Sequence, residues 1–295
     1  MVTGANTGTG RELARMLYSK NAKVYIASRS QEKALSAIQD IQDSCPKSEG
    51  DVIFIPLDLN DLSTIKASAE KFLAAETELH VLFNNAGVQT NDLTKTVQGY
   101  EKHLGVNTIG PFLLTKLLTP AIVRAASKAP QDTVRVVWVS SSGTEIAGIK
   151  DTAVDMQNLD DHAPKPWLTA YGLSKAGNWL HAVEYARRHR VDGIVSVALN
   201  PGNLASDLYR DATGLFKYFV KAVTYPAING AYTELFAGFS PEISLENTGC
   251  WVIPFGRIRE IRKDLHNARK SEAEGGNGTA RNFYDWTEEQ VKLFV

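Results

Sequence analysis

Short apolar runs and amphipathic stretches alternate along most of this chain. Runs rich in Val, Ile, Leu and Phe occupy residues 22–27, 52–57, 81–84, 134–139, 194–199 and 250–253, and their length and composition predict buried strands. Between them, apolar side chains recur at helical spacing, as at Leu62, Ile65, Ala69 and Phe72, which predicts helices with one buried face. This alternation favours one α/β domain over residues 1–295, with a parallel sheet covered on both faces.

Three glycines near the amino terminus lie directly before the first predicted helix. Gly4, Gly8 and Gly10 are spaced Gly-x-x-x-Gly-x-Gly. Glycine lets the backbone turn sharply and approach a pyrophosphate, which then lies at the positive end of the following helix. Glycine triplets also occur in ordinary loops, but the position before an amphipathic helix and a further strand favours a dinucleotide cradle.

Polar residues follow the next predicted strands, where the rest of a dinucleotide would lie. Ser28 and Arg29 offer a hydroxyl and a guanidinium, which suit a 2′-phosphate and favour NADP over NAD, although Arg29 could also be a solvated loop charge. Asp58 is expected to face the adenine. Residues 84–87, Asn-Asn-Ala-Gly, are expected to line the cofactor crevice.

Tyr171 and Lys175 are four residues apart in a predicted helix and therefore share one face of it. A free tyrosine has a pKa near ~10, and a neighbouring ammonium favours the phenolate. The pair is thus a candidate for proton transfer. The alternative is an amphipathic helix in which Tyr171 is packed and Lys175 is solvated.

Two further sites carry polar side chains in apolar surroundings. Asn107 lies inside a helical region predicted over about residues 97–126, and a buried polar group needs partners. Ser140, Ser141 and Ser142 follow the strand predicted at 134–139, where a hydroxyl could donate to a substrate oxygen. A serine cluster at that position is also common in ordinary loops.

The carboxyl-terminal half contains several less regular segments. Residues 203–226 carry apolar positions among charges and are interpreted as a helical substrate lid, with a core helix or a membrane contact as alternatives. Residues 250–253 are expected to form the last strand. The extension over 257–295 includes a glycine-rich segment expected to be flexible, and Thr287 to Gln290 resembles a capping box that starts a short closing helix.

The composition and charge of the chain argue against several classes of partner and site. The net charge of −1 gives no electrostatic reason to expect nucleic acid or an anionic membrane as a partner. Cys45 and Cys250 are too few for a disulfide framework and indicate a cytoplasmic protein with reduced thiols. The six histidines show no metal-ligand spacing, so no metal is predicted. No signal peptide and no transmembrane segment is expected.

Taken together, these motifs resemble the short-chain dehydrogenase/reductase family in its single-domain, Rossmann-type form. The stretch from Thr3 to Gly10 resembles its cofactor loop, residues 84–87 its sheet signature, and residues 201–202 its Pro-Gly motif. Residues 106–115, the long gap between Ser141 and Tyr171, and residues 252–256 look most like the retinol-dehydrogenase-like branch, including its fungal members.

The resemblance implies hydride exchange between a nicotinamide and a carbonyl or alcohol carbon of a small-to-medium apolar substrate. Tyr171 would be the general acid or base, Ser141 would hold the substrate oxygen, Lys175 would lower the tyrosine pKa and bind the nicotinamide ribose, and Asn107 would order a water behind Lys175. Ser206 stands where the family often has threonine. The implied cofactor-binding residues are Gly4, Asn6, Thr7, Gly8, Gly10, Arg29, Asp58, Asn85, Ala86, Gly87, Asn107, Tyr171, Lys175, Pro201 and Gly202.

Two departures from the family pattern stand out. Only Met1, Val2 and Thr3 precede the glycine loop, where the family has a complete central strand. Met1 is therefore expected to be an internal methionine of a longer chain, or this form to be poorly stable and to bind the cofactor weakly; the alternative is that neighbouring residues close the gap. The apolar amino-terminal anchor of many relatives is also missing. Alternatives to an oxidoreductase are a catalytically silent NADP-binding regulator and an epimerase or dehydratase that uses the same Tyr–Lys pair. A homo-oligomer is possible.

Overall fold

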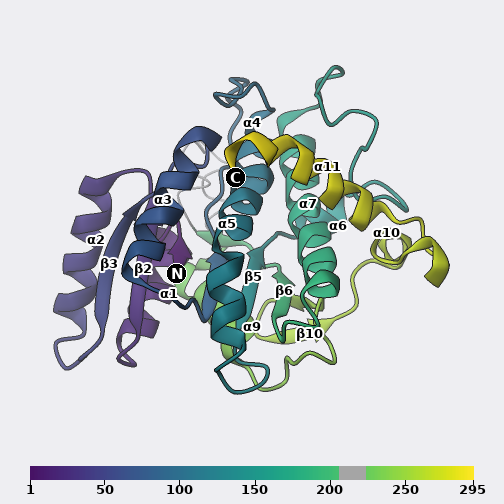
Figure 1. Cartoon of the computed structure of the whole chain (residues 1–295). Coiled ribbons are helices and arrows are strands. Elements are labelled where there is room, and N and C mark those ends of the chain that lie inside the picture. Colours follow the sequence, from purple (N-terminus) through teal and green to yellow (C-terminus); the bar gives the residue numbers. More distant parts are fainter. Residues whose placement is uncertain (206–223) are drawn as a thin grey trace.

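An eight-stranded sheet lies at the centre of the computed structural model, which describes residues 1–205 and 224–295 (Figure 1). The strand order is β10-β9-β6-β5-β4-β1-β2-β3, and every neighbouring pair is parallel except β9 and β10. The predicted doubly wound α/β fold is therefore confirmed. The strands are β1 (Val2–Thr3), β2 (Lys23–Ser28), β3 (Asp51–Pro56), β4 (Val81–Asn84), β5 (Arg135–Val139), β6 (Val195–Leu199), β9 (Trp251–Ile253) and β10 (Arg257–Arg259).

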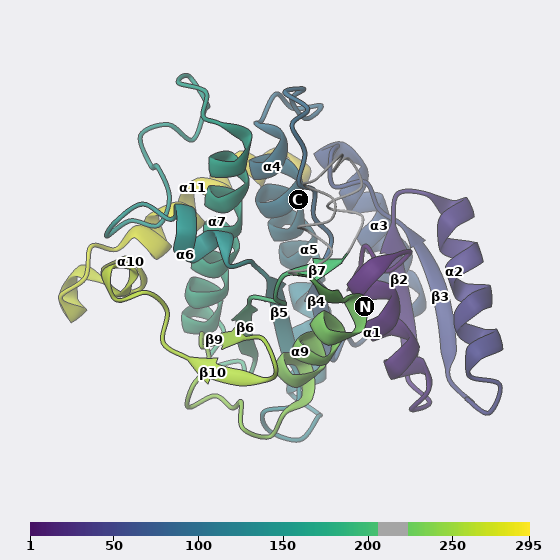
Figure 2. The ribbon, with the colours of Figure 1, turned by 180° about the vertical axis from the view of Figure 1, so that it is seen from behind.

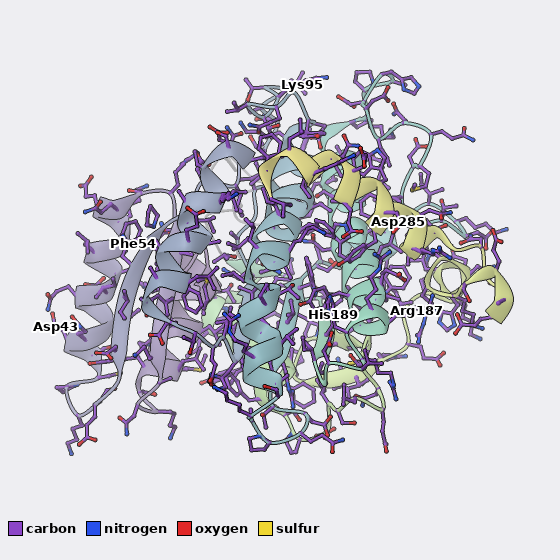
Figure 3. All side chains as sticks on the ribbon, in the orientation of Figure 1. Asp43, Phe54, Lys95, Arg187, His189 and Asp285 are labelled. Atoms are coloured by element: carbon purple, nitrogen blue, oxygen red, sulfur yellow. The ribbon has the colours of Figure 1, made fainter. Side chains whose placement is uncertain are left out.

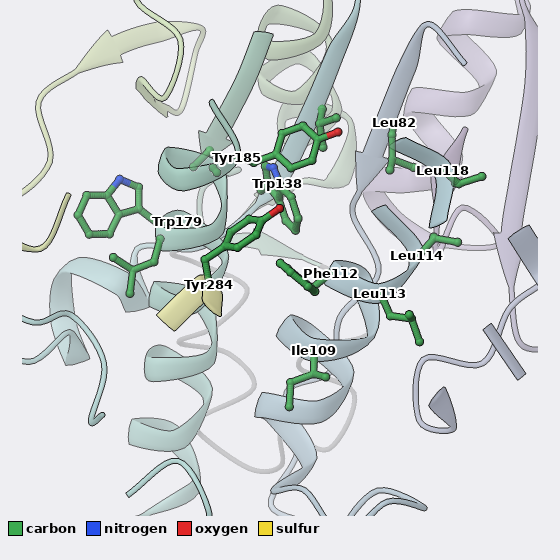
Figure 4. Close-up of a cluster of buried hydrophobic side chains, with 14 of the residues drawn as sticks. Leu82, Ile109, Phe112, Leu113, Leu114, Leu118, Trp138, Trp179, Tyr185 and Tyr284 are labelled. Carbon is green, nitrogen blue, oxygen red and sulfur yellow. The ribbon is translucent and has the colours of Figure 1, made fainter. Parts of the chain in front are cut away.

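Helices cover both faces of this sheet, as the views from the two sides show (Figures 1 and 2). Each face has its own apolar cluster, and the two clusters together form the core. In Figure 4, Trp138 of the sheet lies among Phe112, Tyr185 and Tyr284 of three different helices. One face carries α1 (Gly8–Tyr18), α2 (Gln31–Ser44) and α9 (Ala227–Phe239), and the other carries α3 (Leu62–Ala75), α5 (Gly110–Ala126), α7 (Trp167–Arg188) and α11 (Thr279–Val291).

The first strand is short and central, as expected from its position before the glycine loop. Val2 is fully buried and pairs with Ile26 of β2 and Phe83 of β4. The Met1 amino group donates a hydrogen bond to the Val81 carbonyl at 2.8 Å. Burial of this amino group lowers its pKa to about 5.

The helical region around Asn107 differs from the predicted range of 97–126. It begins at Lys102, because the Glu101 carboxylate accepts the backbone N–H groups of His103 and Leu104 and so caps α4 (Lys102–Leu104). A π-helical segment, Gly105–Ile109, then leads into α5. Among the described residues, the combined stretch 102–126 is the one helix apolar and long enough to span a membrane, but 72% of its apolar window is buried inside the protein.

Two expectations for the carboxyl-terminal extension are wrong. Residues 250–253 do not form the last strand, because β10 follows through a three-residue turn in which Phe255 and Gly256 have φ of 67° and 65°. The closing helix does not start at Thr287, which is buried inside α11; that helix begins at Thr279, after Gly278. Apolar contacts of α11 with the core stabilise additional turns, so the helix begins well before the short capping signal at Thr287.

The glycine-rich segment before α11 contains hydrogen-bonded turns. Gly275 and Gly278 adopt left-handed conformations, with φ of 76° and 69°. Ser271 and Glu274 form a capping box, and backbone hydrogen bonds connect 276 to 271 and 278 to 270. The remaining short elements are α6 (Gly143–Ala147), α10 (His266–Arg269) and the 3-10 turns Lys263–Leu265, Glu272–Glu274 and Lys292–Phe294.

Most of the predicted substrate lid, residues 203–226, lies outside the described residues. At its two ends, β7 (Leu204–Ala205) and β8 (Tyr225–Pro226) pair in parallel. Ser206 also lies outside the described part of the chain.

Candidate active site

Helix α7 places Tyr171 and Lys175 at the carboxyl end of β5. The Lys175 side chain is only 4% exposed, and its Nζ donates a hydrogen bond to the Val139 carbonyl at 2.9 Å. Tyr171 is half-buried, and its ring centroid lies 6.0 Å from Lys175 Nζ. The geometry is thus the reverse of a packed tyrosine beside a solvated lysine. Burial lowers the pKa of Lys175 to about 8, with a partial opposing effect from the charge of Glu234.

Ser140 and Ser141 have different surroundings at the end of β5. Ser140 is buried, and its hydroxyl contacts Thr144 Oγ1 and donates to the Lys175 carbonyl at 2.7 Å, so it connects β5 with α7. Ser141 is half-buried, and its Oγ accepts the N–H of Gly143. A methyl group on Gly143 would lie 3.5 Å from both Ser141 Oγ and Tyr171 Cε1. Ser141 Oγ and the edge of the Tyr171 ring therefore both lie next to Gly143.

The Asn107 amide is fully buried in the π-helical segment and makes three hydrogen bonds. Its Oδ1 accepts the Val88 N–H at 2.7 Å, and its Nδ2 donates to the Val88 carbonyl and to Ser174 Oγ, both at 3.0 Å. Asn107 thus connects the loop after β4 with α7. A methyl group on Gly87 would lie 3.0 Å from Lys175 Nζ and 3.2 Å from Asn107 Oδ1, so residues 87, 107 and 175 converge.

The glycine loop has the shape of a dinucleotide cradle. Gly4 has φ of 68°, and a Cβ there would lie 2.9 Å from the Cα of Ala86. A Cβ on Gly10 would lie 2.5 Å from Asn85 Nδ2, which itself donates to the Thr3 carbonyl. The first turn of α1 carries no acidic residue and no side-chain cap. Its N–H groups and positive dipole end therefore suit an anionic pyrophosphate.

The other predicted cofactor positions follow the ends of several strands or belong to the glycine loop. Ser28 ends β2, is 5% exposed, and its hydroxyl finds no hydrogen-bond partner among the described residues. Arg29 next to it is exposed. Asp58 is half-buried beyond β3 and accepts the Asn60 N–H. Further positions that follow strand ends or belong to the glycine loop are Asn6, Thr7, Gly8, Pro201 and Gly202.

Sequence reasoning missed His103, which is buried against Tyr171. The two rings are 6.0 Å apart in an edge-on arrangement. His103 Nδ1 lies 2.7 Å from Glu101 Oε1, and its Nε2 accepts the Thr90 N–H at 3.2 Å. A histidine one turn before Asn107 was the available signal, but nothing in the pattern placed it near Tyr171.

Glu234 was missed as well. It is fully buried in α9, and neither carboxyl oxygen has a hydrogen-bond partner among the described residues. An acidic residue inside an otherwise apolar helical stretch was the available signal, because such residues are rarely fully buried without a partner.

A glycine loop before a helix and a Tyr–Lys pair at the ends of parallel strands define a nucleotide-dependent oxidoreductase of the Rossmann type. Residues 1–153 match the family model for short chain dehydrogenase. The chain belongs to the short-chain dehydrogenase/reductase family.

Individual relatives agree with this assignment. The short-chain dehydrogenase/reductase bet4 of Neocamarosporium betae is 52% identical over 100% of this chain and 86% of its own length. Human retinol dehydrogenase 12 is 38% identical over 90% of this chain and 83% of its own length, which supports the retinol-dehydrogenase-like branch. An NADPH-bound carbonyl reductase from chicken fatty liver has the same fold, with a TM-score of 0.64 and 21% identity over 88% of this chain and 96% of its own.

Proposed function

We propose that this oxidoreductase interconverts a carbonyl and an alcohol with NADP(H), and that Tyr171 is its general acid and base. One observation carries the proposal: the half-buried Tyr171 lies beside the buried Lys175, and its ring edge and Ser141 Oγ both lie next to Gly143. A proton donor and a second hydroxyl thus belong to side chains that border the same glycine, and the proposal is that a substrate oxygen accepts from both.

The charge on Lys175 favours the phenolate form of Tyr171. With a pKa of about 8, Lys175 is still mainly protonated at pH 7. Its ammonium favours the phenolate of Tyr171 and so brings the phenol closer to the working pH. In reduction, Tyr171 gives its proton to the substrate oxygen while Ser141 holds that oxygen. In oxidation, the Tyr171 phenolate takes the proton back.

Asn107 supports this arrangement by holding two backbone segments together. Because its three hydrogen bonds go to Val88 and Ser174, it fixes the loop after β4 against the helix that carries Tyr171. We therefore assign it a positioning role in addition to the water-ordering role that the family resemblance implies.

The cofactor proposed for this site is NADP. When bound, it supplies the nicotinamide carbon that gives or takes a hydride. The loop from Gly4 to Gly10 would hold the pyrophosphate, and Lys175 the nicotinamide ribose. At the end of β2, the hydroxyl of Ser28 has no hydrogen-bond partner within residues 1–205 and 224–295, and the guanidinium of Arg29 is exposed. These two groups suit the 2′-phosphate of NADP better than the 2′-hydroxyl of NAD.

The surroundings of Tyr171 support an apolar substrate. Helix α6 begins two residues after Ser141 and packs against the start of α7 at Ala147 and Gly172. Large apolar side chains are exposed on both helices, with Ile146 at 79% and Leu168 at 57% exposure, next to Trp167. Exposed apolar side chains on the two helices that begin near Ser141 and carry Tyr171 favour a carbonyl compound with an apolar body.

The deciding experiment is Tyr171→Phe, assayed by NADPH absorbance in single turnover across ketones, aldehydes and quinones. Loss of the phenol should abolish turnover and leave NADPH affinity nearly unchanged. The matched control is Tyr232→Phe, which removes an exposed phenol on α9. Substantial turnover in Tyr171→Phe would rule out the assigned mechanism, and a wild-type protein that binds NADPH without any turnover would favour a silent regulator.

A further inference from the structure

His103 is a buried aromatic side chain beside Tyr171 that the proposed reaction leaves unused. It is 1% exposed, and the two ring centroids lie 6.0 Å apart with their planes at 79°. Helix α4, which carries His103, packs against α7, which carries Tyr171. Because Tyr171 is only half-buried, each neighbour that contacts its ring restricts how far the side chain can rotate about its χ angles.

Hydrogen bonds at both ring nitrogens hold His103 itself. Its Nε2 accepts the Thr90 N–H at 3.2 Å, and its Nδ1 lies 2.7 Å from Glu101 Oε1. A backbone N–H can only donate, so Nε2 is the nitrogen without a hydrogen, and Nδ1 donates its hydrogen to Glu101. The Glu101 carboxylate is fixed in turn by the backbone N–H groups of His103 and Leu104. Because both nitrogens of His103 are engaged, its contact with Tyr171 is one of packing and not of proton transfer.

Asn107, one turn further along this helical region, shows what a residue that only attaches the loop looks like. It connects the loop after β4 with α7 by hydrogen bonds alone. His103 connects the same loop and the same helix through one hydrogen bond, to Thr90, and one ring contact, to Tyr171. Attachment of the loop needs the hydrogen bond and no ring. The edge-on ring contact is therefore the feature of His103 that bears directly on the proposed acid.

Building on the proposed role of Tyr171 as general acid and base, we propose that His103 is a positioning residue whose ring holds the Tyr171 ring in its reactive orientation. A general acid must lie within hydrogen-bond reach of the atom that it protonates. The contact with His103 restricts rotation of the Tyr171 side chain and so keeps the phenol directed at the substrate oxygen. Loss of the contact leaves the phenol itself unchanged but lowers the fraction of molecules in which it can transfer its proton.

Three variants separate the ring of His103 from its hydrogen bonds. His103→Leu removes both, His103→Phe restores a ring, and His103→Gln restores an acceptor for the Thr90 N–H without a ring. In carbonyl reduction, His103→Leu and His103→Gln should lower kcat about tenfold or more, while KM and the affinity for NADPH change little. His103→Phe should restore kcat to within about threefold of wild type. The control His80→Leu replaces an exposed histidine before β4 and should behave as wild type.

The pattern of rescue decides between positioning of Tyr171 and attachment of the loop. If His103→Gln restores kcat and His103→Phe does not, His103 acts through Thr90 and the proposal fails. If the three variants are equally slow, or if His103→Leu keeps the wild-type kcat, the ring contact does not position Tyr171 and the proposal fails as well.

A second measurement, by nuclear magnetic resonance, needs no turnover. In wild-type protein labelled at histidine and tyrosine, a nuclear Overhauser cross-peak should connect the rings of His103 and Tyr171. Three-bond couplings should show one χ1 rotamer of Tyr171 in wild type and in His103→Phe, and an average over several rotamers in His103→Leu. A missing cross-peak in wild type, or a single rotamer in His103→Leu, overturns the proposal. A wild-type protein that reduces no carbonyl refutes the proposed function instead, and the couplings still decide whether His103 holds the Tyr171 ring.

Discussion

His181 should make this fold sensitive to mild acid. Its ring is fully buried on α7, stacks on Phe283 of α11 at 4.9 Å, and lies 3.0 Å from Thr287 Oγ1 through Nε2. Because Thr287 Oγ1 donates to the Phe283 carbonyl, the ring must donate its Nε2 proton to Thr287 and remain neutral. Burial accordingly lowers the pKa of His181 to about 3.

The size of the effect follows from the two pKa values. In the unfolded chain histidine titrates near ~6.5, so the folded state binds fewer protons between about pH 6.5 and 3. The stabilisation is complete above pH 6.5 and is lost as the pH falls through this window. At pH 5, which is about 1.5 pH units below the pKa of histidine in the unfolded chain, the free energy of unfolding is about 2 kcal/mol lower. That is a large part of a typical stability of about 5 to 15 kcal/mol.

The assay is urea denaturation at pH 7.5 and pH 5, with His181→Phe compared to wild type. The variant keeps an aromatic ring in the cluster but has no proton to gain, so it should lose about 2 kcal/mol less than wild type between the two pH values. The Met1 amino group, with its pKa of about 5, weakens both proteins alike on acidification and cancels in the comparison. The control His162→Gln replaces an exposed histidine and should behave as wild type. Equal losses in His181→Phe and wild type would refute the reasoning.

Three further predictions address the cofactor site and the first strand. Arg29→Ala should raise the dissociation constant for NADPH more than tenfold and leave that for NADH little changed, because a lost charge-assisted contact costs about 1.5 to 3 kcal/mol. Equal losses of affinity for both cofactors in a fluorescence titration would mean that Arg29 does not bind the phosphate. Gly4→Ala should lower the free energy of unfolding in urea by about 1 to 3 kcal/mol, because its Cβ meets the Ala86 backbone. Gly8→Ala, with φ of 56° but open space around it, should lower that free energy less, and the reverse order would contradict this packing. Adding the apolar segment Lys-Val-Val-Ile before Met1 replaces the buried amine by an amide and so removes the free-energy cost of burying that amine, about 1.4 kcal/mol at pH 7. The melting temperature Tm should rise by about 2 to 4 °C, and an unchanged Tm would show that burial of this amine is not costly.

Surface ion pairs contribute little to the stability of this fold. Where α7 meets α11, Arg187 and Asp285 line a cleft with residues of both charges (Figure 3). Arg187 binds Glu274 and Arg188 binds Asp285 in this exposed network. Because exposed pairs are individually worth about 0 to 1 kcal/mol, the buried contacts of α11 at His181 carry most of its attachment.

Local sequence patterns were sufficient for the regular parts of this protein. Strand runs such as 134–139 and helix stripes such as Leu62, Ile65, Ala69 and Phe72 predict the observed elements, because burial of one face or of a whole strand imposes a period on the sequence. The glycine loop and the Tyr171–Lys175 pair were recognisable for the same reason, since their chemistry depends on short and fixed spacings.

Only the tertiary structure decided what surrounds these groups. Glu101 caps the amino terminus at Lys102, so this helix begins later than the predicted residue 97, and apolar contacts extend α11 back to Thr279, well before its capping signal. His103 reaches Tyr171 although the two residues are 68 positions apart in sequence, and Glu234 is fully buried in α9 without a hydrogen-bond partner among the described residues. Hydrogen bonds and electrostatic fields act through space and not along the chain. The partners that set a pKa therefore leave no periodic signal, and they become visible only when the sheet brings distant segments together.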